Sequence, residues 1–274
     1  MNPKKKENVS TGKAQSGQTE HLNEVRHVIA VMSGKGGVGK SLVSGLLAVA
    51  LRRAGHQVGL LDADITGPSI PKMFFPEIVR PESSPEGILP AESRLGIKVM
   101  SINLILPDED QAVIWRGPLI GRAIQQFWVD VLWGALDYLV VDLPPGTSDA
   151  PLTVMQSLPL SGVVLVTSPQ DLAGMVVRKA AQMAQHMKVP ILGLVENMSY
   201  FVCPDTGKQY DIFGPSHAEK MAARLGAPFL GRLSIEPEIA RLCDAGRLED
   251  YPAEVFVPMA QRLADWAPLA RRFG

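Results

Sequence analysis

The chain has 274 residues, of which 46% are hydrophobic, and its 28 acidic side chains nearly balance 27 lysines and arginines, for a formal net charge of −1. This size fits one α/β domain with a large core, and the near-neutral charge gives no reason to expect a nucleic-acid or membrane-surface partner. Two cysteines are too few for a disulfide framework and no apolar run reaches 18 residues, so we expect a cytoplasmic protein without a membrane span.

The first 26 residues are polar and contain almost no large apolar side chain. Such a segment buries too little apolar surface to offset the entropy lost on ordering. We therefore expect residues 1–26 to be a disordered tail and residues 27–274 to be the folded domain. The triple lysine at residues 4–6 could contact nucleic acid or lipid, but a solvated tail is the simpler interpretation.

A glycine-rich stretch follows, Gly34-Lys35-Gly36-Gly37-Val38-Gly39-Lys40-Ser41. It matches G-x-x-x-x-G-K-[ST], the loop that surrounds the phosphates of a nucleotide, with an apolar run before it and helical spacing after it. Glycines let backbone N–H groups converge on phosphate oxygens, and the next helix directs its positive end there. We expect Lys40 to reach the β- and γ-phosphates and the Ser41 hydroxyl to bind Mg²⁺, which makes residues 27–274 a P-loop ATPase domain.

Two carboxylates, Asp62 and Asp64, follow the second apolar run. Beside a Mg²⁺–triphosphate complex, a carboxylate holds metal-bound water or orients the attacking water. The alternative is that either aspartate caps the turn that follows. Six prolines between residues 68 and 90 exclude a long helix, so that stretch is expected to be irregular, as a flap or a dimer surface.

Asp142 ends another apolar run and precedes Leu-Pro-Pro-Gly-Thr. An acidic residue at the tip of a buried strand beside a P-loop binds Mg²⁺, usually through water, so Asp142 is assigned to the metal. After the two stiff prolines, the Gly146 N–H could approach the γ-phosphate, and loops of this type rearrange when that phosphate leaves. Asp149 is expected to cap the next helix.

Apolar runs alternate with helical segments along the domain, and the runs are apolar at successive positions, as in strands covered on both faces. This pattern predicts an α/β fold in which helices flank a mostly parallel β-sheet on both faces and ligands bind beyond the carboxyl ends of the strands. Strands are expected at residues 27–32, 57–61, 97–104, 138–142, 162–167, 191–196 and 228–232, and helices at 41–54, 118–133, 150–157, 173–187, 217–225, 236–245 and 253–271.

The motif K-G-G-V-G-K-S at residues 35–41 resembles the deviant Walker A ATPases, which include MinD, ParA, the nitrogenase iron protein and the Mrp-type iron–sulfur carriers. Three further stretches are similar to the Mrp branch: residues 64–71, residues 115–118, and residues 196–204 with 212–214. The resemblance covers the chain from about residue 26 to its end.

The resemblance implies a homodimer that binds and hydrolyses ATP. In that family the lysine matching Lys35 crosses to the partner's nucleotide, and the aspartate matching Asp64 positions the hydrolytic water. Asp62 would then lie nearer Mg²⁺, and Asn197 would hydrogen-bond adenine, with a plain turn as the alternative for Asn197. Lys35, Lys40 and Asp64 are thus the catalytic candidates.

The Mrp branch also has a C-P-x-C pair, and four such thiolates in a dimer would hold a [4Fe–4S] cluster. This sequence has Cys203 but places Thr206 at the second cysteine position, which leaves two thiolates for a dimer. Asp205 or His217 could complete an iron–sulfur site, and a loop cysteine without metal is the alternative. Cys243 is expected to be a core residue.

By resemblance, the protein would carry iron–sulfur clusters to apoproteins, with cluster assembly proteins as further partners. The alternative is a ParA/MinD-like positioning or regulatory ATPase without a cluster, which would need a basic dimer face or an uninterrupted amphipathic C-terminal helix. Because Pro258 and Pro268 interrupt the last segment, we expect a final helix that packs on the sheet instead.

Overall fold

The computed structural model describes residues 22–65, 67–77, 79–105, 117–252 and 256–270. Nine strands of this part of the chain form one sheet, and two more form a separate hairpin. The sheet contains β1 (Glu24–Ser33), β2 (Val58–Asp62), β5 (Ala91–Glu92), β6 (Lys98–Ser101), β7 (Ala135–Asp142), β8 (Gly162–Thr167), β9 (Ile191–Val202), β10 (Gln209–Tyr210) and β11 (Phe229–Ser234). The hairpin contains β3 (Glu82–Ser83) and β4 (Ile88–Leu89).

The strand order is β10-β9-β8-β1-β7-β2-β6-β5, with β11 also paired to β9. Each pair is parallel except β9 with β10 and β5 with β6. The mostly parallel sheet predicted from the sequence is therefore confirmed.

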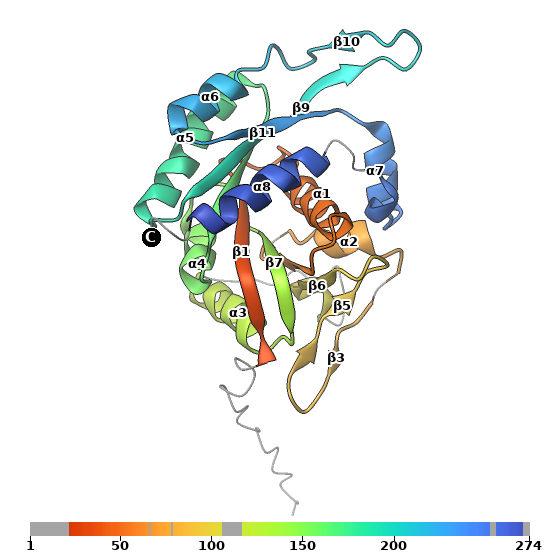
Figure 1. Ribbon diagram of the computed structural model, residues 1–274, viewed down its shortest axis with the longest axis vertical. Coiled ribbons are helices and arrows are strands. Elements are labelled where there is room, and N and C mark those ends of the chain that lie inside the picture. Colours follow the sequence, from red (N-terminus) through yellow and green to blue (C-terminus); the bar gives the residue numbers. More distant parts are fainter. Residues whose placement is uncertain (1–21, 66, 78, 106–116, 253–255, 271–274) are drawn as a thin grey trace, which may run out of the picture.

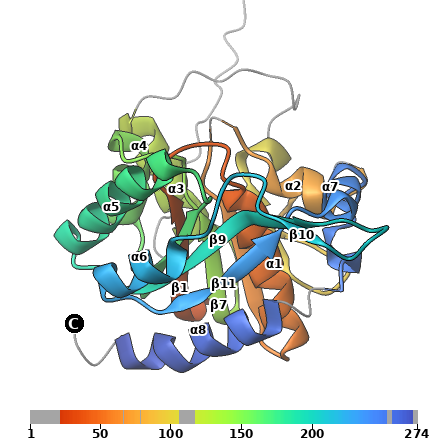
Figure 2. The ribbon, with the colours of Figure 1, turned by 90° about the horizontal axis from the view of Figure 1, so that it is seen from above.

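Helices cover both faces of the sheet (Figures 1 and 2). One face carries α1 (Lys40–Arg53), α2 (Ile70–Phe74), α7 (Pro237–Asp244) and α8 (Val257–Ala270), with the 3-10 turn η3 (Leu248–Asp250). The other carries α3 (Gly117–Val129), α4 (Asp149–Ser157), α5 (Asp171–His186) and α6 (Ala218–Leu225). Each face has its own apolar core because successive strand residues point to opposite sides: Ile29 and Val31 enter one core, and Val28 and Ala30 the other.

Strand β1 begins three residues earlier than predicted, so the tail boundary at residue 26 was placed too late. Glu24 pairs with Ala135 of β7, and the Arg26 guanidinium forms an ion pair with Asp137 at 2.8 Å. The Asn23 amide donates to the Val131 carbonyl, which fixes the entry to the strand. The expected disorder of residues 1–21 concerns a segment outside the described residues, as does part of the motif at residues 115–118.

Three further elements differ from their predicted ends. Helix α3 ends at Val129 because Val131 leaves it to bridge Ile88, while buried Trp133 donates its indole N–H to the Phe127 carbonyl. Strand β9 continues past residue 196 and pairs with β10, forming a hairpin that projects beyond the body of the molecule (Figure 1). A short 3-10 turn, η2 (Ile102–Leu104), replaces the end of the strand predicted at 97–104.

The proline-rich stretch at residues 68–90 is not wholly irregular, because it contains the five-residue helix α2 and the β3–β4 hairpin. Helix α8 spans both prolines that were expected to interrupt it. Pro258 lies in its first turn, where the N–H that proline lacks would have no helical partner. Met259 and Leu263 are buried, so the predicted packing of the last helix on the sheet is confirmed. Among the described helices, none has the length and apolar character needed to cross a bilayer.

Candidate functional site

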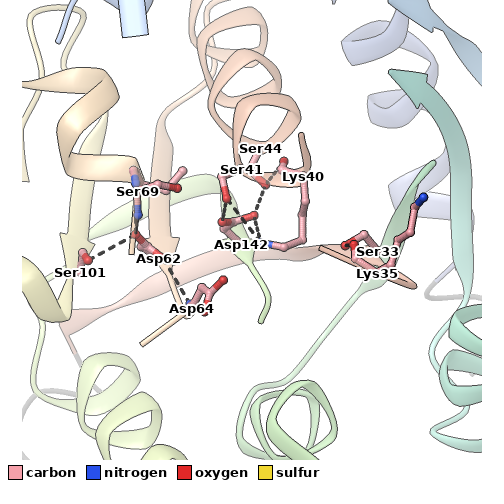
Figure 3. A network of polar contacts seen from close by, with 11 residues as sticks. Ser33, Lys35, Lys40, Ser41, Ser44, Asp62, Asp64, Ser69, Ser101 and Asp142 are labelled. Carbon is pink, nitrogen blue, oxygen red and sulfur yellow. Dashed lines mark hydrogen bonds and ion pairs between the residues drawn. The ribbon is translucent and has the colours of Figure 1, made fainter. Parts of the chain in front are cut away.

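The sheet brings three separately predicted motifs to one edge. Strand β7 lies between β1 and β2, and the register pairs Asp142 with Val31 on one side and with Asp62 on the other. The glycine-rich loop after β1 therefore lies beside the carboxylates that end β7 and β2 (Figure 3). This is the carboxyl edge of the parallel strands, where ligands bind in folds of this class.

Asp142 is the centre of a buried polar cluster (Figure 3). Its Oδ1 lies 2.8 Å from Lys40 Nζ, and its Oδ2 accepts a hydrogen bond from the Ser41 hydroxyl at 2.5 Å. Asp142 is fully buried and Lys40 is 6% exposed, so each charge depends on the other for compensation. A hydroxyl and a carboxylate oxygen are ligands that Mg²⁺ accepts, so Ser41 and Asp142 fit that ion.

The sequence reasoning missed Ser44, whose hydroxyl donates to Asp142 Oδ1 at 2.7 Å. It lies one helical turn after Lys40 and Ser41 on the same face of α1, and the residues one turn further on, Leu47 and Ala48, are apolar. That isolated buried hydroxyl was the signal that could have revealed it.

The glycines of the loop have distinct structural reasons. Gly37 and Gly39 both have φ of +78°, which favours glycine. A Cβ on Gly34 would lie 2.3 Å from the Val176 carbonyl oxygen, so α5 packs directly on the loop backbone. The buried Asn197 side chain packs there too, and its amide donates to the Val38 carbonyl at 3.0 Å. Asn197 thus supports the loop in this structure, and its contact with adenine stays a prediction.

Asp62 is fully buried and organises the turn after β2. Burial, and then the charge of Asp142, raise the pKa of Asp62 to about 8, so a cation reaching it at neutral pH would displace a proton. Its carboxyl group accepts four hydrogen bonds at 3.1–3.3 Å, from the N–H groups of Asp64, Ser69 and Ile70 and from the Ser101 hydroxyl. The capped-turn alternative therefore describes Asp62 in this conformation, and its role near Mg²⁺ stays a prediction.

Two other groups that were predicted to contact the nucleotide form hydrogen bonds within the chain instead. Lys35 points away from the Asp142 cluster (Figure 3). Its Nζ donates to Gln170 Oε1 at 2.6 Å. The Gly146 N–H donates to the Ser33 carbonyl at 3.0 Å. The prediction that Asp149 caps a helix was wrong, because Asp149 is the first residue of α4 and its backbone lies inside the helix.

Cys203 lies in the turn between β9 and β10. Its carbonyl accepts the Gly207 N–H at 2.8 Å, which closes a tight turn. Hydrogen bonding from the Thr206 side chain, and then from the N–H groups of Thr206 and Asp205, lowers the pKa of the Cys203 thiol. Position 206 therefore faces the Cys203 sulfur. Within one chain, the described residues contain no group of three or more His, Cys, Asp or Glu side chains that could hold a metal. A site that Asp205 or His217 completes between two subunits stays a prediction.

The two cysteines are expected to react with thiol reagents at different rates. Cys243 packs against the core, where burial and then the charge of Asp244 raise its pKa to about 11, so little thiolate forms at neutral pH. At pH 7.5 we expect Cys203 to react at least about tenfold faster with Ellman's reagent. Thr206→Val should slow Cys203 and leave Cys243 unchanged. Equal rates in the native protein would contradict the assignment.

The chain is similar to a known protein family and to several of its members. The ParA family model described as NUBPL iron-transfer P-loop NTPase matches residues 24–265. The chain is 46% identical over 251 residues to the iron-sulfur cluster carrier protein of Methanocaldococcus jannaschii, covering 90% of this chain and 87% of that protein. It is 43% identical over 246 residues to the cytosolic Fe-S cluster assembly factor CFD1 of Chaetomium globosum, covering 84% and 81%.

A solved structure is also similar, that of the nucleotide-binding protein of Archaeoglobus fulgidus in complex with ADP. The TM-score is 0.77 at 45% identity, and the match covers 86% of this chain and 93% of that one. The glycine-rich loop, the strand-end aspartates and these relatives agree, and the chain belongs to the NUBPL iron-transfer family of P-loop NTPases.

Proposed function

We propose that this protein is an ATP-hydrolysing, homodimeric carrier that binds iron–sulfur clusters and transfers them to apoproteins. The Lys40–Ser41–Asp142 cluster beside the glycine-rich loop supports the proposal, because a cation, a hydroxyl and a carboxylate meet there, the groups that a Mg²⁺–triphosphate would need. The solved relative bound to ADP supports a nucleotide at this loop. The names of the relatives support the cluster as cargo.

In the proposed cycle, Lys40 would exchange Asp142 for the β- and γ-phosphates, and Ser41 and Asp142 would hold Mg²⁺. Bound Mg²⁺ would neutralise charge on the phosphate oxygens. Asp64 orients the attacking water. No covalent intermediate is needed, because catalysis consists of positioning and electrostatic stabilisation. The hydrogen bond from Gly146 to Ser33 would break when the loop moves toward the phosphate.

The cargo site would combine the Cys203 turns of two subunits. Four large apolar side chains near this turn are unusually exposed, which suits a surface that a second copy covers. They are Val202 (42% exposed), Tyr210 (43%), Ile212 (56%) and Phe213 (40%). The cluster type is part of the proposal. A [4Fe–4S] cluster takes four ligands, and a dimer supplies only two Cys203 thiolates, so the other ligands would have to come from other groups.

A transfer assay tests the proposal. The full chain is reconstituted anaerobically with iron and sulfide, desalted, and mixed with an apo-ferredoxin in the presence of an iron chelator. We expect the ferredoxin spectrum to develop despite the chelator, and faster with ATP and Mg²⁺. A colourless protein, or transfer that occurs only without the chelator, would contradict the carrier function.

The positioning-ATPase alternative has no specific support in the structure. It required a free amphipathic helix at the C-terminus or a basic dimer face. The α8 face that contains Met259, Ala260 and Leu263 is instead buried against the core.

Asp64→Ala is expected to preserve ATP binding and to reduce ATP turnover by about 100-fold or more, because a positioned water would lose its orienting group. Asp64→Asn should behave in the same way, since the amide cannot replace the carboxylate charge. Calorimetric titration with ATP and a phosphate-release assay measure the two properties. Normal turnover in both variants would assign the water-positioning role to another residue.

Lys35→Ala is expected to leave ATP binding intact and to prevent dimer formation with a non-hydrolysable ATP analogue. In the isolated chain this change removes little beyond the hydrogen bond to Gln170. Gln170→Ala is the matched control, because it breaks the same bond but leaves the ammonium group available to a partner's nucleotide. We expect it to dimerise at least as well as the native protein in light scattering. Loss of the dimer in both variants, or in neither, would count against an intersubunit role for Lys35.

A further inference from the structure

A basic groove lies between α5 and α6, which run side by side on one face of the sheet (Figures 1 and 2). Its volume is about 300 Å³. It is lined by Arg178, His217, Lys220, Met221, Arg224 and Leu225. None of these residues belongs to the nucleotide loop or to the turn that holds Cys203.

The sequence of α6 builds most of this groove. His217, the residue before α6, and four residues of the helix line the groove at spacing i, i+3, i+4, i+7 and i+8, which places them on one face. Met221 and Leu225 are half-buried and pack against the core, whereas Lys220 and Arg224 are exposed. Gly174 of α5 lets the two helices approach closely, because a Cβ there would lie 3.3 Å from Met221 Cε.

The cations of the groove are not neutralised by the described part of the chain. No acidic side chain lines the groove, and Arg178, Lys220 and Arg224 form no ion pair with a described residue. The ion pairs that the described residues do form use Arg26, Lys40, His56, Arg94, Arg232, Arg241 and Arg247. The net charge of the chain is −1, so its surface is not basic in general. The three cations around the apolar floor are therefore a local concentration of positive charge.

We propose that this groove binds an acidic segment of a partner protein, with one apolar side chain of the segment against Met221 and Leu225. Two observations favour this ligand over a single phosphate or a nucleic acid. His217 to Arg224 spans about 10 Å of helix, which exceeds the reach of one phosphate group. The floor is apolar, and methionine adapts to varied side chains. Carboxylates on both sides of an apolar anchor would match the charge and the hydrophobicity together. The proposal goes beyond the cluster-carrier function and does not depend on it.

The test uses the full chain and three fluorescein-labelled 12-residue peptides, read by fluorescence anisotropy. The first peptide contains glutamates around two leucines, the second replaces the leucines by serine, and the third replaces the glutamates by lysine. We expect only the first to bind well, with affinity that falls as salt rises. Equal binding of the first two peptides would show a nonspecific charge effect and overturn the proposal, as would failure of the first peptide to bind.

Substitutions in the groove test whether the first peptide binds there. Lys220→Glu with Arg224→Glu should weaken the first peptide at least tenfold, and Met221→Gln should weaken it without a change of charge. The control, Lys72→Glu with Arg122→Glu, makes the same charge change outside the groove and should have little effect. If the variant with Lys220→Glu and Arg224→Glu does not fold, the variant with Lys220→Gln and Arg224→Gln is used in its place. Equal loss in the control variant, or tighter binding of a single-stranded oligonucleotide or inorganic phosphate at the groove, would refute a peptide site.

Discussion

Lys40→Ala is expected to abolish ATP binding and also to destabilise the nucleotide-free protein. The first effect follows from the loss of the ammonium group that is proposed to bind the β- and γ-phosphates. The second follows from burial: Asp142 is fully buried, and without Lys40 its charge has lost its ion-pair partner. Breaking one side of such a pair costs about 3–5 kcal/mol of unfolding free energy. Calorimetric titration and urea unfolding measure the two effects separately.

A double variant distinguishes these effects. Lys40→Ala with Asp142→Asn removes both charges, so it should recover much of the stability while ATP binding stays absent. If the double variant recovers ATP binding as well, the single variant failed through misfolding. Unchanged ATP affinity in Lys40→Ala would refute the nucleotide site itself.

Thr206→Cys is expected to increase the iron and sulfide held after anaerobic reconstitution, and Cys203→Ala to abolish it. The turn closed by Gly207 brings the side chain at position 206 beside the Cys203 sulfur, so a cysteine there would add a second thiolate at ligand spacing. A dimer of this variant would have four thiolates, the number that a [4Fe–4S] cluster takes. Metal analysis and absorbance near about 400 nm provide the readout.

Two controls sharpen this second prediction. Thr206→Ser keeps a hydroxyl and should hold no more iron than the native protein. Cys243→Ala should not reduce the iron content, because Cys243 is on α7 and packs against the core, away from the Cys203 turn. If the iron and sulfide content does not depend on Cys203, the proposed cargo site is wrong. The proposed ATPase function would not be affected by that result.

In this conformation, the groups that are predicted to bind the nucleotide already contact other groups of the same chain. Asp142 forms an ion pair with Lys40 and accepts a hydrogen bond from Ser41. Lys35 donates a hydrogen bond to Gln170, and the Gly146 N–H donates one to the Ser33 carbonyl. ATP binding would therefore exchange existing contacts for new ones, which couples the site to movement of the loops after β1 and β7. The Lys35 and Gln170 variants test one of these exchanges directly.

The sequence alone determined the features that depend on short-range chemistry. The loop at residues 34–41 could be read directly because a phosphate cradle needs glycines and a lysine at fixed spacing. The successive apolar residues of the strands predicted a parallel sheet covered on both faces, and most element ends fell within a few residues of those observed. Asp142 was assigned to the site from its place at a strand end, and the structure puts it beside Lys40.

Only the tertiary structure decided which distant groups meet. Strand β7 lies between β1 and β2, so Asp142, and not Asp62, pairs with Lys40, while Asp62 is left to bind the turn beside it. Asn197 reaches Val38 from 159 residues away, and α6 meets Arg178 across a groove. Such contacts depend on strand order and helix packing, which are set by the summed burial of the whole core and not by the local pattern at any one residue.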